Sequence, residues 1–444
     1  MNNKNITKEE VIRLVKENNV KFIRLWFADI TGQMKGLTIT TEELKHVFED
    51  GMGFDGSSIK GFARIDESDM VAMPDPSTFM LLPYRPKEKA EAGMICDILN
   101  PDRSPYEGDS RHILKKQLEK IEKKGYTLYI GPELEFFIFK DDKSTETLDE
   151  GGYFDITTLD AGNEVRRDII LTLKQMGVDV EYSHHEVAPS QHEIDLRFKE
   201  GLTMADTVMI YRMVVREIAQ LKGVYATFMP KPVYGINGSG MHTHQSLFKG
   251  ESNIFFDIKD KHHLSTEAKH YIAGIMKHSK EITLICNQWV NSYKRLVVGY
   301  EAPVYICWAL KNRSSMIRVP MYQPKKEKST RIEFRSPDPA CNPYLAFACM
   351  VSAGMKGIKK EYPLCEPLER DVYHLTEEEK ERLGVECLPG SLIEAIEIAE
   401  SSELLKETLG EHVFANLLAA KKIEWDEYRK RVHEYEIKKY LPIL

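Results

Sequence analysis

The chain has 444 residues, of which 42% are hydrophobic and 29% charged, and its formal net charge is −8. This length allows a large core and favours two or more domains. The acidic balance and the absence of a long basic block argue against nucleic acid as a main partner.

The seven cysteines are scattered and form no C-x-x-C pair, which indicates reduced thiols rather than a disulfide framework or a zinc site. The polar N-terminus is unlike a signal peptide, and no apolar run is long enough to cross a bilayer. We therefore expect a cytoplasmic protein without membrane association.

The N-terminal part predicts a small α+β domain. Thr7 and Glu10 form a capping box for a first helix. Strands are expected over 21–27, 33–39, 79–82 and 94–99, with a short helix beginning near residue 41. The polar, proline-bearing stretch 100–109 predicts a boundary between domains 1–105 and 106–444.

Within this part, residues 51–58 read Gly-Met-Gly-Phe-Asp-Gly-Ser-Ser and contain the dinucleotide pattern G-x-G-x-x-G. That fingerprint follows a strand and opens a helix, whereas the residues before this stretch look helical and Pro74 follows soon after. We interpret the stretch as a shaped, exposed loop, in which Asp55 has a simple role as a turn-former or a functional one.

Alternating strands and helices predict a large α+β domain after residue 105. Helices are expected over 111–124, 164–176, 204–221, 267–285, 344–359 and 392–407, and again from residue 412. Strands are expected over 131–139, 178–183, 193–198 and 226–229.

Two carboxylates share one face of the strand predicted at 131–139. In Gly-Pro-Glu-Leu-Glu-Phe-Phe-Ile-Phe, Glu133 and Glu135 point one way, and Leu134 and Phe136 the other. Neighbouring carboxylates repel each other, so one keeps its proton unless a cation intervenes. A hard metal such as Mg²⁺ removes the conflict, and a solvated edge strand with two exposed acids is the alternative.

Glu186 and Glu193 bracket the turn at Pro189, with histidines beside them. Neither His-Glu pair forms the H-E-x-x-H zinc motif, and Pro189 would break the helix which that motif needs. The two acids could close on one cation, or they could be ordinary surface acids.

The stretch 237–246 reads Asn-Gly-Ser-Gly-Met-His-Thr-His-Gln-Ser. Its glycines allow the backbone to approach a ligand closely, and His242, His244 and Ser246 share one strand face. A metal ligand beside nucleotide contacts fits this pattern, as does a glycine-rich hairpin with partly exposed histidines.

A cluster of cations and acids follows. Arginine pairs well with carboxylates and phosphates, and phosphoryl transfer needs positive charge on the moving group. A surface ion-pair network is the alternative. The cluster comprises Lys294, Arg295, Glu301, Arg313, Arg318, Arg331, Glu333 and Arg335.

Neither a P-loop nor a G-x-S-x-G nucleophile elbow occurs in the chain. Carboxylates with histidine, arginines and no covalent nucleophile point to metal-assisted phosphoryl transfer or to hydrolysis.

Six segments in order then resemble the signatures of type I glutamine synthetase over nearly the whole chain. They are Phe54-Asp-Gly-Ser-Ser58, Gly131-Pro-Glu-Leu-Glu-Phe136, Asn237-Gly-Ser-Gly-Met-His242, Lys294-Arg-Leu296, Asn312-Arg-Ser314 and Arg331-Ile-Glu-Phe-Arg335. The length, without an extra C-terminal insertion, is similar to that of the shorter bacterial alpha subtype.

The resemblance implies a β-grasp N-terminal domain and a catalytic domain with a curved antiparallel sheet. It implies a homododecamer of two stacked hexameric rings with active sites between neighbouring subunits. ATP would phosphorylate the γ-carboxylate of L-glutamate, and ammonia from ammonium would displace phosphate to give glutamine for nitrogen assimilation. A regulatory protein partner is left open.

By position in the family, Mg²⁺ or Mn²⁺ ions would occupy two or more sites in each active centre. Glu135, Glu186 and Glu193 would hold the metal near the ammonium side. Glu133, His242 and Glu333 would hold the metal that bridges the phosphates of ATP.

The same resemblance gives roles to the remaining residues. Asp55 of a neighbouring subunit would take a proton from ammonium, and Glu301 would lie on a flap that shields the acyl phosphate. Glutamate would be bound by Asn237, Gly238, Arg295 and Arg335, with Glu301 and Arg313 beside it. The transferring phosphoryl group and ATP would be contacted by Arg313, Arg318, Glu181, His244 and Ser246, with Arg331 near the nucleotide.

Four further features carry expectations of their own. Residues 319–332 are longer and richer in lysine than expected for the alpha subtype, and the lysines could reach phosphates or adenine. Tyr373 falls where the longer subtype carries a nucleotidylated tyrosine, but its surroundings differ, so we predict no such modification. Arg64 is a candidate for feedback inhibition, and residues 423–444 for contacts across a ring interface.

Three alternatives compete with glutamine synthesis. A related ligase would join glutamate to a larger amine such as a polyamine. A non-catalytic, ring-forming homologue should lack metal ligands, whereas all six are present here. A carboxylate-metal hydrolase would not require the arginine set.

Overall fold

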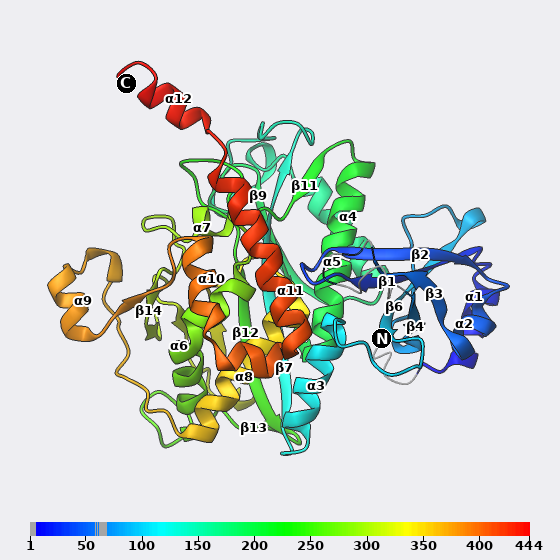
Figure 1. Cartoon of the computed structure of the whole chain (residues 1–444), viewed down its shortest axis with the longest axis horizontal. Coiled ribbons are helices and arrows are strands. Elements are labelled where there is room, and N and C mark those ends of the chain that lie inside the picture. The colour runs from blue at the N-terminus through cyan, green and yellow to red at the C-terminus, as the bar shows by residue number, and fades with distance from the viewer. Residues whose placement is uncertain (1–5, 58, 60, 62–68) are drawn as a thin grey trace.

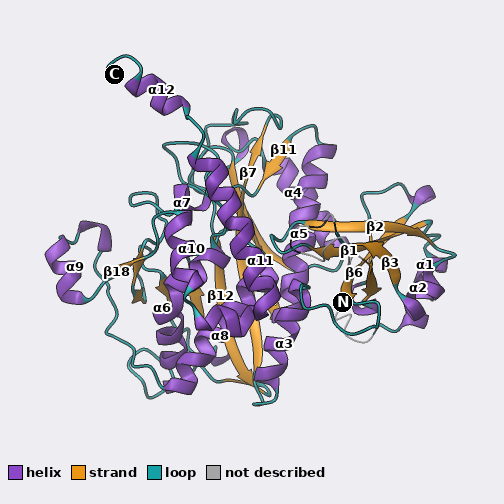
Figure 2. Ribbon diagram, in the orientation of Figure 1, coloured by secondary structure: helices purple, strands orange, loops and turns teal. Residues whose placement is uncertain are grey.

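The computed structural model of this chain describes residues 6–57, 59, 61 and 69–444, and it confirms a mixed α+β architecture (Figures 1 and 2). The main helices of this part are α1 (Lys8–Glu17), α2 (Leu44–Asp50), α3 (Ser110–Glu122), α4 (Asn163–Gln175), α5 (Gly201–Leu221), α6 (Thr266–Cys286), α7 (Ser292–Arg295), α8 (Pro343–Lys360), α9 (Glu377–Leu383), α10 (Leu392–Glu400), α11 (Glu403–Arg429) and α12 (Glu434–Tyr440). None of these described helices is long and apolar enough to span a membrane.

The N-terminal part is built on a sheet with the order β2-β1-β6-β4-β3. The strands are β1 (Phe22–Ala28), β2 (Met34–Thr40), β3 (Met52–Asp55), β4 (Asp69–Pro74) and β6 (Glu91–Leu99), with β5 (Met80–Leu81) also paired to β6. β1 and β6 run parallel. Apolar side chains of α1 and α2, including Val11 and Phe48, pack against Ile23 and Leu25 of β1 to form a separate core.

The prediction of a loop over 51–58 is partly wrong, because Met52–Asp55 forms the edge strand β3. Its pairing with β4 supplies hydrogen bonds that the local glycine pattern does not reveal. The stretch follows α2 and opens a strand, so it does not have the helix that a dinucleotide fingerprint requires.

The second sheet has the order β15-β16-β17-β12-β7-β9-β8 and is antiparallel apart from the β15–β16 pair. Its strands are β7 (Thr127–Phe139), β8 (Val180–His185), β9 (Gln191–Leu196), β12 (Met241–Lys249), β15 (Trp308–Ala309), β16 (Ile317–Arg318) and β17 (Ile332–Phe334). The short strands β10 (Lys199–Glu200) and β11 (Tyr225–Thr227) pair with β7, and β13 (Ser252–Asn253) pairs with β12, while β14 (Tyr305–Ile306) pairs with β18 (Glu386–Cys387) elsewhere.

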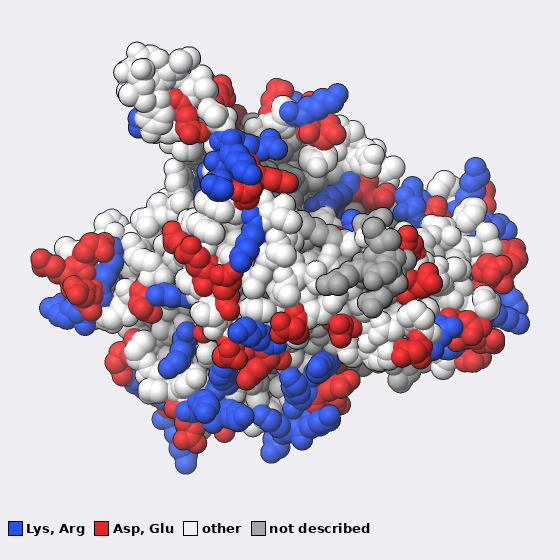
Figure 3. Space-filling view, in the orientation of Figure 1, with Lys and Arg blue, Asp and Glu red and all other residues white. Residues whose placement is uncertain are grey.

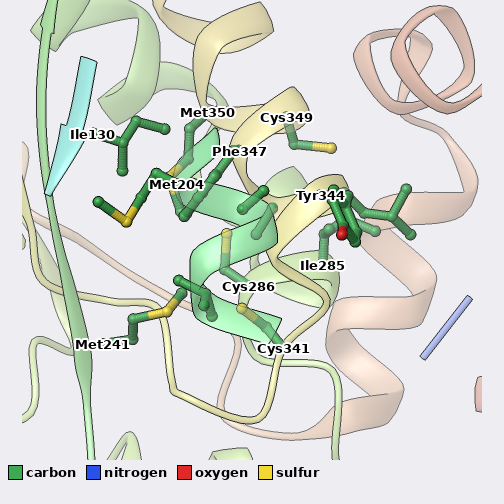
Figure 4. Close-up of a cluster of buried hydrophobic side chains, with 14 of the residues drawn as sticks. Ile130, Met204, Met241, Ile285, Cys286, Cys341, Tyr344, Phe347, Cys349 and Met350 are labelled. Carbon is green, nitrogen blue, oxygen red and sulfur yellow. The ribbon is translucent and has the colours of Figure 1, made fainter. Parts of the chain in front are cut away.

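The 13-residue strand β7 lies inside this sheet, between β12 and β9. The edge-strand alternative for Glu133 and Glu135 is therefore wrong. Leu134 and Phe136 point into the main core, where Phe136 contacts Tyr211 of α5. Figure 2 shows α8, α10 and α11 lying over the strands, and Figure 4 shows Phe347 and Met350 of α8 packed near Ile130 and Met204.

The helix expected over 392–407 is two helices. α10 ends at Glu400, and α11 begins at Glu403 because the Ser402 hydroxyl accepts a hydrogen bond of 3.1 Å from the Leu405 N–H. Gly410, at φ 76°, interrupts α11 within its first turns. The apolar spacing continues across both breaks, so periodicity alone does not reveal them.

A buried ion cluster joins the two sheets' domains. Arg111 of α3 donates to Asp206 of α5 at 2.9 and 3.0 Å, to Asp97 of β6 at 2.6 Å and to Asp75 at 2.7 Å. The Arg111 side chain is 3% exposed. One guanidinium therefore pairs with three carboxylates drawn from both parts of the chain, and Lys115 of α3 also pairs with Asp97. Elsewhere, acidic and basic side chains are interspersed over the face shown in Figure 3.

Replacing Arg111 with alanine is expected to lower the free energy of unfolding by about 3–5 kcal/mol, because it leaves the largely buried Asp206 and Asp75 without their counter-charge. Arg167→Ala is the control, since Arg167 forms an exposed ion pair with Glu164 and should cost no more than about 1 kcal/mol. Thermal and urea unfolding of both variants would measure the difference, and equal effects would contradict the assignment.

Candidate functional site

Glu133 and Glu135 sit side by side on the face of β7 opposite the core. Glu133 pairs across the sheet with His242 on β12 and Asp195 on β9, and Glu135 pairs with Glu193 on β9. Both glutamates line a cavity of about 390 Å³. The two side chains share a face as the alternation predicts, and Asp195 and Glu193 lie beside them on the neighbouring strand.

The hairpin between β8 and β9 supplies two further predicted acids. Glu186 and Glu193 both line the same cavity, and His184 lies between them, with its Nε2 2.9 Å from Glu186 Oε1 and 3.8 Å from Glu193 Oε1. His184, Glu186 and Glu193 can direct one atom each at a common point. The sequence interpretation noted histidines here without giving His184 a role.

These acids repel one another. Burial, and then the charge of Glu186, raise the pKa of Glu135 to about 8. Burial, and then the charges of Asp195, Glu133 and Glu135, raise the pKa of Glu193 well above its usual range. A divalent cation would relieve both penalties, so this donor set fits a metal site.

A second set gathers around Glu133 on its other side. His242 Nδ1 lies 3.3 Å from Glu133 Oε2 and 3.9 Å from Glu333 Oε1, while His244 Nε2 lies 2.7 Å from Glu133 Oε1. The structure thus brings together Glu133, His242 and Glu333 and adds His244. Glu133, His244 and Glu333 also form a group with suitable spacing for a cation.

Arginines already balance this second set. Arg318 and Arg335 both form ion pairs with the buried Glu333. Burial alone would raise its pKa, but Arg335 and His244 hold the pKa of Glu333 at about 2. Burial also acts to raise the pKa of Glu133, but His244 and His242 face its two oxygens and hold that pKa well below the usual range. Both carboxylates are therefore ionised and able to bind a cation.

A larger cavity of about 790 Å³ adjoins the first, and Glu133, Tyr182, Arg313 and Arg318 line both. The predicted nucleotide residues Glu181, His244, Ser246, Arg313, Arg318 and Arg331 all line the larger cavity. Tyr129, Tyr182 and Phe198 give it aromatic walls that the sequence interpretation missed. Period two along β7 places Tyr129 on the face of Glu133, a signal that could have found it.

The long stretch 319–332 leaves the strand register intact. Arg318 of β16 stands opposite Glu333 of β17, and the intervening loop is anchored by Tyr322, whose ring lies 4.7 Å from that of His263. Lys326 and Lys328 from this loop line the larger cavity. The prediction that lysines here could approach a nucleotide is compatible with this placement.

Asn237, Gly238, Arg295 and Arg335 all line the smaller cavity. Arg295 is held by backbone carbonyls, donating to Ser336 at 2.7 Å and to Arg335 at 3.1 Å. A Cβ atom at position 240 would lie 2.6 Å from Arg295 Nη2, so a larger residue there would push the Arg295 guanidinium out of place. The Gly240 N–H instead donates to Glu135 at 3.0 Å.

Glu301 lies at the rim of the smaller cavity in the loop between α7 and β14. Its φ of 56° is in the left-handed region, which costs a residue with a side chain about 1–2 kcal/mol. The loop therefore needs contacts that hold this conformation.

The predicted residue Asp55 lies away from these cavities. Asp55 ends β3 in the N-terminal sheet, where its Oδ1 accepts from the Ser57 N–H at 2.8 Å, and it lines neither cavity of its own chain. Arg64 falls outside the described residues.

Asp149, which the sequence interpretation missed, fixes the tip of the β8–β9 hairpin. Its carboxylate accepts hydrogen bonds from the Ser190 N–H at 2.8 Å, from His185 Nε2 at 3.1 Å and from the Ala161 N–H at 2.9 Å. His185 Nδ1 in turn donates to the Glu186 carbonyl at 2.7 Å. The Asp149 loop and the β8–β9 hairpin are far apart in the sequence, so no local pattern predicts the contacts between them.

A third histidine–carboxylate group lies behind this hairpin, comprising Asp160, His185 and His192. Arg166 donates to both oxygens of Asp160 at 2.7 and 2.8 Å and to His192 Nδ1 at 2.8 Å. Because the guanidinium already supplies the positive charge, we assign no metal to this group.

A sequence model described as glutamine synthetase, catalytic domain, matches residues 107–440, and one described as glutamine synthetase, beta-Grasp domain, matches residues 19–101. A glutamine synthetase of Methanosarcina mazei is 52% identical over 442 residues, covering 99% of this chain and 98% of the relative. One from Thermotoga maritima is 47% identical over 440 residues, covering 98% and 100%.

Solved structures show the same architecture. The cryo-EM structure of Plasmodium falciparum glutamine synthetase has a TM-score of 0.88 at 28% identity and covers 98% of each chain. A structure titled GmaS/ADP complex has a TM-score of 0.89 at 28% identity, covering 97% of this chain and 99% of its own. The predicted β-grasp domain and the curved sheet of the larger domain are confirmed.

Divalent cations are expected to stabilise the fold because they relieve the repulsion among Glu135, Glu186 and Glu193. Binding at 100 times the Kd contributes about 2.7 kcal/mol. Thermal unfolding of chelator-treated protein with and without Mg²⁺ would measure the gain. Glu193→Gln should reduce it, while the exposed Glu251→Gln should not, and an identical unfolding temperature with and without metal would contradict the site.

Asp149→Asn is expected to weaken metal binding about 10- to 100-fold, since it loosens the hairpin that carries Glu186 and Glu193. Asp141→Asn is the matched control, because Asp141 caps only Lys143 and Ser144 in an exposed turn. Calorimetric titration with Mn²⁺ would compare the two variants. Unchanged affinity in Asp149→Asn would show that the hairpin holds its shape without this carboxylate.

Proposed function

This chain belongs to the glutamine synthetase family, and we propose that it ligates ammonia to the γ-carboxylate of L-glutamate with hydrolysis of ATP to ADP and phosphate. The observation that carries the proposal is the pair of adjoining cavities that share Glu133, Arg313 and Arg318. One cavity is rich in carboxylates, and the other has aromatic walls and basic residues. A phosphoryl group could therefore pass between two ligands without leaving the protein.

We propose two divalent cations, Mg²⁺ or Mn²⁺, in each active centre. Glu135, Glu186 and Glu193 would hold one, which is supported by their mutual repulsion and raised pKa values. Glu133, His242 and Glu333 would hold the other, beside the larger cavity. Such ions neutralise phosphate charge and orient the reacting oxygens.

The remaining residues would bind and orient the substrates. Asn237, Gly238, Arg295 and Arg335 line the cavity proposed for glutamate, and Glu301 stands at its rim. Arg313 lines both cavities and would stabilise the transferring phosphoryl group. Glu181, His244, Ser246 and Arg318 would contact ATP, and the aromatic rings of Tyr129 and Phe198 offer faces for its base.

We propose that the active centre is completed by a second chain. Asp55 lines neither cavity of its own chain, which is compatible with its use by a neighbour as the base for ammonium. The C-terminal helix α12 stands away from the body in Figure 1 and exposes Tyr435 and Ile437, and Leu441 just after the helix is also exposed. Such apolar surface supports a contact between subunits in a dodecamer of two hexameric rings.

Further proposals rest on the sequence, some on its composition and some on the family resemblance. They are membership of the type I alpha subtype, a cytoplasmic location, division into domains 1–105 and 106–444, feedback inhibition through Arg64, and a regulatory protein partner.

The main alternative is ligation of glutamate to a larger amine, because such a ligase would need the same metals and arginines. A non-catalytic homologue is disfavoured by the convergence of all six predicted ligands on one site. A hydrolase is disfavoured because nothing in hydrolysis requires Arg295, Arg313 and Arg335 together.

The purified protein is expected to form glutamine only when glutamate, ATP, Mg²⁺ and ammonium are all present. Glu133→Gln should lower the rate at least about 100-fold, because Glu133 lies between both cavities, whereas the exposed Glu251→Gln should not. Asp55→Ala tests the ammonium site. Product with a polyamine but not with ammonium would move the function to the alternative ligase.

A further inference from the structure

The loop that carries Glu301 spans residues 297–303 and is called the flap here. It connects α7 to β14, and both Gly299 and Glu301 have positive φ values, 97° and 56°. Tyr300, Glu301 and Ala302 line the smaller cavity. A loop with this backbone has few internal hydrogen bonds, so its position depends on contacts with other segments.

Tyr373 makes one such contact from the far side. Its hydroxyl donates to the Ala302 carbonyl at 2.6 Å, and its ring packs against Tyr305 with centroids 6.1 Å apart. Burial raises the pKa of Tyr373 to about 12, so the hydroxyl is protonated and able to donate at neutral pH. The bond reaches the flap backbone one residue beyond Glu301.

The segment that holds Tyr373 is itself fixed to the phosphoryl side of the site. Asp371 caps the short helix Val372–His374 by accepting from the Tyr373 N–H at 3.0 Å. Asn312 donates to the Arg370 carbonyl at 2.6 Å, next to Arg313. The Tyr373 hydroxyl therefore connects the flap to the loop that presents Arg313.

A different contact holds the other side of the flap. Lys231 Nζ lies 3.8 Å from the centre of the Tyr300 ring, and the Lys231 backbone is tied to Asn291 in both directions, at 2.7 and 2.9 Å. This contact positions Tyr300, but it does not reach Ala302. Among the described residues, the Ala302 carbonyl, which follows Glu301, is bound by the Tyr373 hydroxyl.

We infer that Tyr373 is a positioning residue whose hydroxyl holds the flap closed over the acyl phosphate, so that ammonia rather than water attacks it. The inference rests on the proposed synthetase reaction. When ammonia attacks the γ-carbonyl carbon, the C–O bond to phosphate breaks, and glutamine and phosphate leave. When water attacks the same carbon, the same bond breaks, but glutamate is regenerated and ATP is spent without product.

The test is Tyr373→Phe, which keeps the ring against Tyr305 and removes only the hydroxyl. Wild-type protein should release close to one phosphate per glutamine. In the variant, the share of acyl phosphate lost to water should rise about 2- to 10-fold, as expected for the loss of one hydrogen bond, so phosphate should exceed glutamine. Tyr234→Phe, at a side chain that is 97% exposed, is the matched control and should stay coupled.

The source of the extra phosphate can be identified in ¹⁸O-labelled water. Attack on the acyl carbon places the label in recovered glutamate, whereas attack on ATP places it in phosphate. Label in glutamate with Tyr373→Phe supports the inference. A one-to-one ratio in the variant, whatever its rate, overturns it, as does label confined to phosphate. Absence of glutamine with the wild-type protein would instead reject the proposed function.

Discussion

Five carboxylates crowd onto one face of a central sheet, and most of the site follows from how their charge is balanced. Buried like charges at this spacing cannot all be ionised without cations nearby. Glu333 and Glu133 are balanced by arginines and histidines of the chain itself. Glu135 and Glu193 are not, and their pKa values are raised. This asymmetry indicates that the side formed by Glu135 and Glu193 has the greater need for an external cation.

The carboxylates keep their positions because the opposite face of the sheet is packed rigidly against the core. β7 is a long interior strand whose Leu134 and Phe136 are fully buried against the helical layer. A shift of one residue would turn Glu133 and Glu135 into the core, so the hydrophobic pattern fixes the register of the acids. The same strand therefore specifies both the fold and the location of the metal ligands.

The sequence predicted the parts of the site that obey short periods or known motifs. Alternation placed Glu133 and Glu135 on one face, local patterns suggested Glu186, Glu193 and His242 as cation ligands, and family resemblance added Glu333. Most long helices were also predicted, because their apolar spacing is regular. The break between α10 and α11 was missed because a single side chain, the Ser402 cap, determines it. Strand β3 was missed because it depends on pairing with β4.

Contacts between distant segments could not be predicted from a single sequence. Asp149 contacts a hairpin some 40 residues away in the chain, and no pattern in its own loop or in the hairpin predicts this contact. Phe198 and His184 became visible as cavity residues only when the sheet had brought them beside Glu133 and Glu186. Such contacts are set by tertiary geometry, whereas local patterns determine only which face a side chain occupies.

The two kinds of element meet different mechanical demands. Metal ligands must keep their positions to within a fraction of an ångström, and strands backed by a packed core provide this. A cover over a reactive intermediate must open for substrate and product, so it cannot be packed as firmly. A loop strained at Glu301 and held by single contacts at Tyr300 and Ala302 satisfies that second demand. Weak closure is then a property that the reaction requires, and its failure should appear as lost coupling before it appears as lost fold.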